Sequence, residues 1–172
     1  SVCSGSWEYT GDGHALALWA GAELRDMEFV QFHPTGMVWP PSVRGILVTE
    51  GVRGEGGRLT NSKGDRFMFD YVPEMFAGDH AATVEESDQW VEEVVSGKLA
   101  TVRRPPELLT RDVVAKAINS EVKAGRGSPH GGAFLDISHR GKEAILAKLP
   151  SMHHQFKELA GVDISEEPME VG

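Results

Sequence analysis

A histidine at position 33 stands at the end of a segment that alternates like a β-strand. In Asp26–His33 every second side chain faces the same way if the segment is extended, which groups Gln31 with His33. Pro34 ends the pattern and Gly36 permits a turn. An imidazole at the end of a strand can form part of a binding site, or it can be an ordinary structural histidine. The spacing alone leaves both interpretations open.

A glycine-rich stretch that runs from Thr49 to Gly57 supplies a hydroxyl, a carboxylate and a guanidinium close together, on Thr49, Glu50 and Arg53. Its glycines let backbone amides approach a ligand. The pattern is not a phosphate-binding loop, because it lacks the Gly-Lys-Ser/Thr ending and carries two glutamates that would repel phosphate. By itself it is equally explained as a turn with a structural Glu–Arg ion pair.

Arg111 stands where a helix is expected to begin. Thr110 can cap a helix that runs to about Ala124, and Gly125 can end it. A cation in the first turn opposes the helix dipole at a cost of roughly 0.3–1 kcal/mol, which Asp112 partly offsets. A residue placed against a local rule points to function, whereas the structural interpretation is a surface salt bridge.

Three stretches, Asp26–Gly36, Thr49–Gly57 and Leu109–Ala115, together resemble the substrate-binding or capping domain of the succinate dehydrogenase and fumarate reductase flavoprotein family. The resemblance covers the ordered motifs from Thr10 to Asp136, apart from one insertion. It implies that the intact subunit interconverts succinate and fumarate by hydride transfer with FAD, under a cap that closes over the dicarboxylate and excludes water.

The resemblance also implies a role for each residue of the three stretches. His33 and Thr49 would hold carboxylate oxygens of the substrate, and Glu50 would contact it as well. Arg111 would transfer the proton, and Glu50 with Arg53 would form the relay that supplies it. An arginine has a pKa above about 12 in water, so this role requires burial and a shuttle. The family supplies a further histidine and arginine from a later segment.

The resemblance predicts a division of the chain and its partners. Residues 1–26 would end the FAD-binding domain, where Asp12 would contact the flavin, and residues 27–172 would form the capping domain, with an insertion at about 74–106 peripheral to catalysis. No Gly-x-Gly-x-x-Gly follows a strand, so we expect this piece of a larger subunit to be inactive alone and not to retain FAD. Its partners would be the dicarboxylate, the FAD-binding domain of the same subunit, membrane anchor subunits and an iron–sulfur subunit. In a bacterium this would place it peripherally, at the cytoplasmic face of the membrane.

Composition narrows the possible classes further. The net charge of −9 argues against a nucleic-acid partner, and no run of about 18 apolar residues could span a membrane. The single Cys3 excludes an internal disulfide and an iron–sulfur cluster held by this chain alone. Adjacent His153 and His154 cannot both face one metal from a helix, so we expect them at the surface and predict no metal site.

The 172 residues are enough for a domain with its own core, and their patterns predict an α+β fold of short strands and a hairpin packed with several helices. We expect no strand or helix to close the chain after residue 167. The expected elements are a helix over 14–24 capped by Asp12, strands over 26–33, 45–49 and 133–137, a hairpin over 58–68 turning at Gly64, an acidic amphipathic helix inside the insertion, and helices over 110–124, 140–149 and 152–159.

Two alternatives stay open. The cap of L-aspartate oxidase shares the arginine at position 111, although the Gly51–Gly57 pattern fits the dehydrogenases better. A non-catalytic module that binds dicarboxylates or serves assembly is a possibility of another class.

Overall fold

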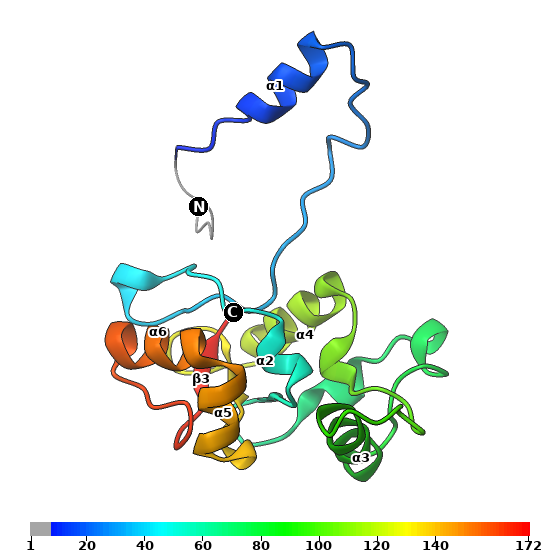
Figure 1. Ribbon diagram of the computed structural model, residues 1–172, viewed down its shortest axis with the longest axis vertical. Helices are drawn as coiled ribbons and strands as arrows, with labels where there is room; N and C mark the ends of the chain where they lie inside the picture. The colour runs from blue at the N-terminus through cyan, green and yellow to red at the C-terminus, as the bar shows by residue number, and fades with distance from the viewer. Residues whose placement is uncertain (1–7) are drawn as a thin grey trace.

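The protein, described here by a computed structural model over residues 8–172, consists of a body with an N-terminal arm that extends away from it (Figure 1). Cys3 lies outside the described residues. The body contains one antiparallel sheet of three short strands in the order β1 (Arg58–Thr60), β2 (Ala133–Asp136) and β3 (Met169–Val171). The predicted α+β class is confirmed.

The register of the sheet places one row of apolar side chains in the core. Leu59 pairs with Leu135, which in turn pairs with Met169, and all three are fully buried. At the edge of β2, a Cβ atom on Gly132 would lie only 2.2 Å from the carbonyl oxygen of Val171. Only glycine therefore lets β3 approach β2 this closely.

Helices cover the sheet and complete the core. The longest, α4 (Arg111–Lys123), buries Val114, Ala117 and Ile118, and it is followed by Gly125 in the left-handed region. This helix and its glycine stop are confirmed as predicted. The other helices are α1 (Asp12–Trp19), the single turn α2 (Gly51–Gly54), α3 (Val84–Val95), α5 (Lys142–Lys148) and α6 (Pro150–Ala160).

The predicted hairpin over residues 58–68 is wrong. A tight turn does form at Gly64, where its amide donates to the carbonyl oxygen of Asn61. However, the returning segment becomes the 3-10 helix η2 (Phe67–Tyr71), and β1 pairs with β2 instead. Phe67 and Met68 are both buried in this helical turn, so burial in the core decides the conformation over local strand propensity.

Three further expectations about the body are wrong. The chain does not end irregularly, because β3 closes the sheet. The segment 45–49 makes only a single bridge, between Leu47 and Gly36. His153 is not a surface residue: its ring is buried and its Nε2 lies 3.1 Å from Asp163 Oδ1, while His154 is exposed. The helix period places these two neighbours on different faces.

The N-terminal arm also departs from expectation. Helix α1 begins at Asp12 with Gly11 as its N-cap, so Asp12 is not the cap, and it ends at Trp19 before Gly21 in the left-handed region. Residues 26–33 form no strand, since no described segment pairs with them. Alternation sets which side chains share a face, but a strand also needs a hydrogen-bonded neighbour.

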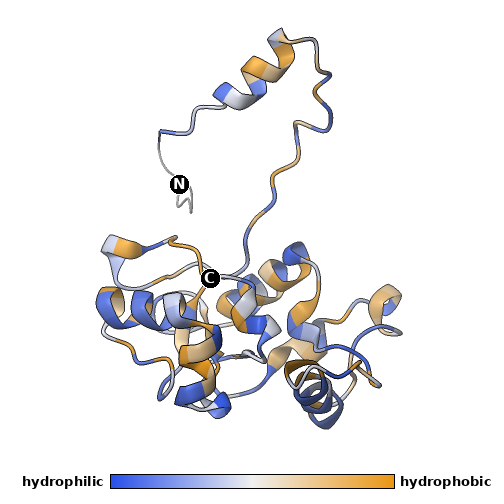
Figure 2. Ribbon diagram, in the orientation of Figure 1, coloured by the Kyte–Doolittle hydropathy of each residue, from blue (hydrophilic) through white to orange (hydrophobic). Residues whose placement is uncertain are grey.

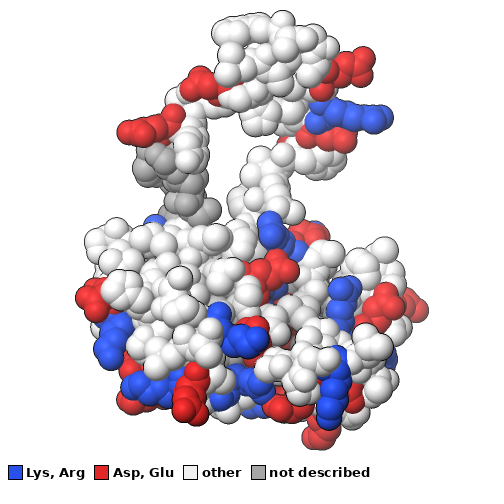
Figure 3. All heavy atoms as spheres, in the orientation of Figure 1, with Lys and Arg blue, Asp and Glu red and all other residues white. Residues whose placement is uncertain are grey.

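The arm carries many exposed apolar side chains. Phe29 and Phe32 are 74% and 71% exposed, and no residue of α1 is buried. Figure 2 shows orange segments along the arm, and Figure 3 shows mostly uncharged atoms there, in contrast to the mixed charges over the body. Monomeric proteins rarely expose apolar patches of this extent, so the arm has the surface of a segment that packs against another structure.

The segment 74–106 lies to one side of the body, around α3. The predicted acidic amphipathic helix is confirmed: Val91 is buried, and Thr83 caps the helix by accepting a hydrogen bond from the amide of Glu86. None of the helices within residues 8–172 combines the length and the apolar character needed to cross a bilayer.

Candidate functional site

The turn α2 places a carboxylate at the surface and a guanidinium inside the protein. Glu50 immediately precedes α2 and is half exposed, whereas Arg53 is 1% exposed. One turn of helix brings Arg53 Nη2 to 3.6 Å from Glu50 Oε2. The predicted Glu–Arg ion pair is thus present, with one partner in the core and the other open to solvent.

Arg53 is incompletely paired for a buried cation. Its Nη1 donates to the carbonyl oxygen of Glu107 at 2.6 Å, but its Nε and Nη2 have no hydrogen-bond partner among residues 8–172. Burial lowers the pKa of Arg53, and nearby Arg111 adds to this while Glu50 and Glu107 oppose it. A guanidinium whose charged form is disfavoured gives up a proton more readily than one in water.

Arg111, the first residue of α4, reaches the same carboxylate from the other side. Its Nε lies 3.3 Å from Glu50 Oε2, and its Nη1 donates to Gln31 Oε1 at 2.8 Å. Glu50 Oε2 therefore lies between Arg53 and Arg111, which forms a continuous guanidinium–carboxylate–guanidinium chain from the core to the surface. Such an arrangement can pass a proton from one arginine to the other through the carboxylate.

His33 lies within electrostatic range of this chain. Its Nδ1 is 3.3 Å from the amide nitrogen and 3.2 Å from the carbonyl oxygen of Thr35, which holds the ring in place. Burial lowers the pKa of His33, and the positive charges of Arg53 and Arg111 lower it further. At neutral pH the imidazole is therefore uncharged and can donate a hydrogen bond to a carboxylate.

Thr49 stands next to Glu50 and is half buried. Its Oγ1 accepts a hydrogen bond from the amide of Gly51 at 3.3 Å, so its own hydroxyl hydrogen remains available for another acceptor. His33, Thr49 and Arg111 together offer donors to an anion and present no carboxylate except Glu50. This set suits a small substrate that carries carboxylates.

Five of the six residues proposed from the sequence belong to this cluster, and Asp12 does not. Asp12 is exposed on α1 in the arm, where its carboxylate accepts a hydrogen bond from the hydroxyl of Thr10. The described residues do not by themselves fit FAD: their only sheet is antiparallel, and no strand leads through a glycine turn into a helix N-terminus that would hold a pyrophosphate.

Two residues of the cluster's surroundings were not identified from the sequence. Gln31, which contacts Arg111, could have been found, because the alternation already groups its side chain with that of His33. Glu107, whose carbonyl oxygen holds Arg53, could not have been found. A backbone contact between residues 54 positions apart leaves no pattern in the sequence.

Comparisons with known proteins agree with the resemblance. The family described as "FAD binding domain" matches residues 1–171. The A chain of the fumarate reductase (CoM/CoB) of Methanothermobacter marburgensis is 48% identical over 170 residues, which cover 99% of this chain and 25% of that protein. The succinate dehydrogenase flavoprotein subunit of Rickettsia bellii is 37% identical over 166 residues, with coverages of 94% and 22%.

Solved structures give the same answer. The structure titled Mycobacterium smegmatis Sdh1 in complex with UQ1 matches with a TM-score of 0.63 and 57% identity, over 99% of this chain and 23% of that one. The FrdA chain of an E. coli quinol fumarate reductase mutant matches with a TM-score of 0.68 and 36% identity, over 98% and 26%. The chain thus spans about a quarter of the length of the relatives it matches.

Proposed function

Because this chain belongs to the FAD binding domain family, within the group of succinate dehydrogenase and fumarate reductase flavoprotein subunits, we propose that it is the substrate-binding cap of a subunit that interconverts succinate and fumarate. The observation that carries this proposal is the Arg53–Glu50–Arg111 chain with His33 beside it. It joins donors for a dicarboxylate to a route for a proton.

The residues divide into those that hold the substrate and those that move the proton. The neutral imidazole of His33 and the hydroxyl of Thr49 donate to carboxylate oxygens, with Glu50 at the edge of the same site. When fumarate is reduced, Arg111 gives a proton to one of the two central carbons. Glu50 returns a proton to Arg111 and takes one from Arg53. Succinate oxidation runs through the same groups in reverse.

FAD would exchange the hydride with the other central carbon, and it would be held by the rest of the subunit. The exposed apolar side chains of the arm, such as Phe29 and Phe32, fit packing against that FAD-binding part. We place the boundary of the cap at residue 27, with Asp12 on the flavin side. Membrane anchor subunits and an iron–sulfur subunit would complete the assembly, which in a bacterium would hold this subunit peripherally at the cytoplasmic face of the membrane.

The test is turnover by the full-length subunit with succinate and with L-aspartate, measured with an artificial electron acceptor. We expect oxidation of succinate and none of L-aspartate. Preferential oxidation of L-aspartate would assign the cap to the oxidase instead. A full-length subunit that binds dicarboxylate but turns over neither compound would be a non-catalytic module.

A further inference from the structure

The position of Arg53 depends on one residue outside the motif stretches. Of the hydrogen bonds between described residues, its guanidinium makes only the one to the carbonyl oxygen of Glu107, at 2.6 Å. The carboxylate of Glu50 is half exposed and lies further away, at 3.6 Å. The carbonyl of Glu107 is therefore the contact that fixes where this buried cation lies.

Glu107 is itself held by a buried arginine. Its side chain is fully buried, and both carboxylate oxygens accept from Arg66, from Nε at 2.6 Å and from Nη2 at 3.1 Å. Burial disfavours the charged form of Arg66, but the hydrogen bonds to Glu107 outweigh this and raise its pKa. The two side chains thus form a paired, charged unit with fork-like geometry.

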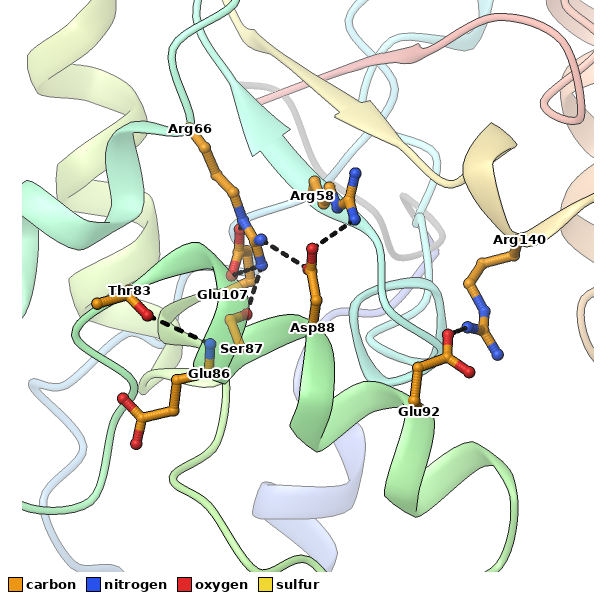
Figure 4. A network of polar contacts seen from close by, with 9 residues as sticks. All are labelled: Arg58, Arg66, Thr83, Glu86, Ser87, Asp88, Glu92, Glu107 and Arg140. Carbon is orange, nitrogen blue, oxygen red and sulfur yellow. Dashed lines mark hydrogen bonds and ion pairs between the residues drawn. The ribbon is translucent and has the colours of Figure 1, made fainter.

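The remaining donors of Arg66 reach into α3. Nη1 lies 3.0 Å from Asp88 Oδ1, and Nη2 lies 2.6 Å from the hydroxyl of Ser87. Figure 4 shows Arg66 between Glu107 and these two residues, with Arg58 on the other side of Asp88 at 2.8 Å. The helix of the segment 74–106 therefore shares an arginine with the residue that holds Arg53.

The same short turn carries the chain into the second arginine of the relay. Glu107 lies in the 3-10 helix η4 (Pro106–Leu108), which packs against α2 and η2. The proline at its start limits the backbone, and α4 begins at Arg111 directly after the next two residues. Fixing the carboxylate of Glu107 therefore fixes Arg53 through a carbonyl and Arg111 through the chain.

We propose that Arg66 and Glu107 are positioning residues for the proton relay, and that α3 acts on the relay through Arg66. This rests on the proposed function. A buried ion pair is a weak source of net stability, since the cost of desolvation offsets the attraction. What this pair supplies is the place of the η4 turn, and with it the distances from Glu50 to the two arginines.

The test compares two buried glutamates in the full-length subunit. Glu107→Gln removes the charge at the η4 turn. Glu121→Gln is the matched control, because Glu121 is 2% exposed and is held by both Arg126 Nε and Nη2, at 2.8 and 2.7 Å, but contacts no residue of the relay. Each is measured as a folded, flavin-loaded protein, so that loss of stability is separated from loss of rate.

We expect Glu107→Gln to lower kcat by about 10–100-fold, which is the range for a misplaced catalytic group. KM for succinate should change by less than about threefold, because His33 and Thr49 keep their places. The solvent deuterium isotope effect on kcat should rise as proton delivery becomes limiting. Glu121→Gln should keep kcat and its isotope effect. Equal losses of kcat in the two variants would overturn the proposal.

Two further measurements cover the other outcomes. If Glu107→Gln does not fold, the double variant Arg66→Met, Glu107→Leu replaces the pair by apolar groups. A stable double variant with reduced kcat supports positioning, whereas one with full kcat overturns it. If the wild-type subunit turns over no dicarboxylate, the proposed function fails, and a crystal structure of Glu107→Gln decides the positional claim alone. Arg53 unmoved on the carbonyl of residue 107 would overturn it.

Discussion

Replacing Arg111 by glutamine in the full-length subunit separates a catalytic role from a structural one. Arg111 and Glu50 are 3.3 Å apart, with side chains 42% and 51% exposed. An ion pair so open to solvent contributes about 0–1 kcal/mol to stability. Loss of a general acid lowers turnover by about 10²–10⁴-fold, which corresponds to about 3–5 kcal/mol in the barrier. The kinetic effect therefore exceeds the effect on stability several-fold.

A lysine at this position should fail as well. Arg111 contacts Glu50 through Nε and Gln31 through Nη1 at the same time. A single ammonium group cannot reproduce this fork, and its lower pKa changes the acid. Arg111→Lys should therefore keep the charge and the fold but lose most of the turnover.

The assay is succinate oxidation with an artificial electron acceptor, alongside flavin content and thermal unfolding. Lys116→Gln is the matched control, because Lys116 forms an exposed ion pair on the same helix, 3.2 Å from Asp112. It should retain full turnover. Near-wild-type turnover in Arg111→Gln, at normal flavin content, would remove Arg111 from the mechanism and refute the relay.

Three more outcomes follow from the structure. In an NMR titration of the apo chain, His33 should titrate below its ordinary pKa of 6.5, and the pKa should rise in Arg111→Gln because one of the charges that depress it is gone; burial of the neutral ring then stabilises the fold above pH 6.5 and is lost as pH falls through the lowered pKa, and an unchanged titration in the variant would place Arg111 out of range. The 172-residue chain should purify without FAD and without succinate turnover, since its described residues form no pyrophosphate site, and a flavin absorbance band in the pure chain would contradict this. Replacing residues 74–104 by a Gly/Ser linker in the full subunit should leave KM for succinate within a few-fold, because no hydrogen bond or ion pair of the described residues joins this segment to His33, Thr49, Glu50 or Arg111, while kcat falls in part as Arg66 loses Asp88 and Ser87; complete loss of turnover in a folded variant would show that the segment is not peripheral.

Local patterns in the sequence were sufficient for the helices of the body and for the motifs of the site. The apolar period of α4, its glycine stop and the amphipathic pattern of α3 express interactions within one segment, so they can be read without the rest of the chain. The motif stretches likewise contain five of the six proposed site residues of the family, and these five do lie together.

Contacts between distant segments were decided only by the tertiary structure. Residues 26–33 alternate like a strand but have no paired neighbour, and the segment after Gly64 turns helical because the core takes up Phe67 and Met68. The alignment of Arg53, Glu50 and Arg111 joins residues about 60 positions apart. The contact between Arg53 and the carbonyl of Glu107 is made by a backbone atom that every residue possesses. Residue types cannot encode such a contact, because it depends only on where packing places the chain.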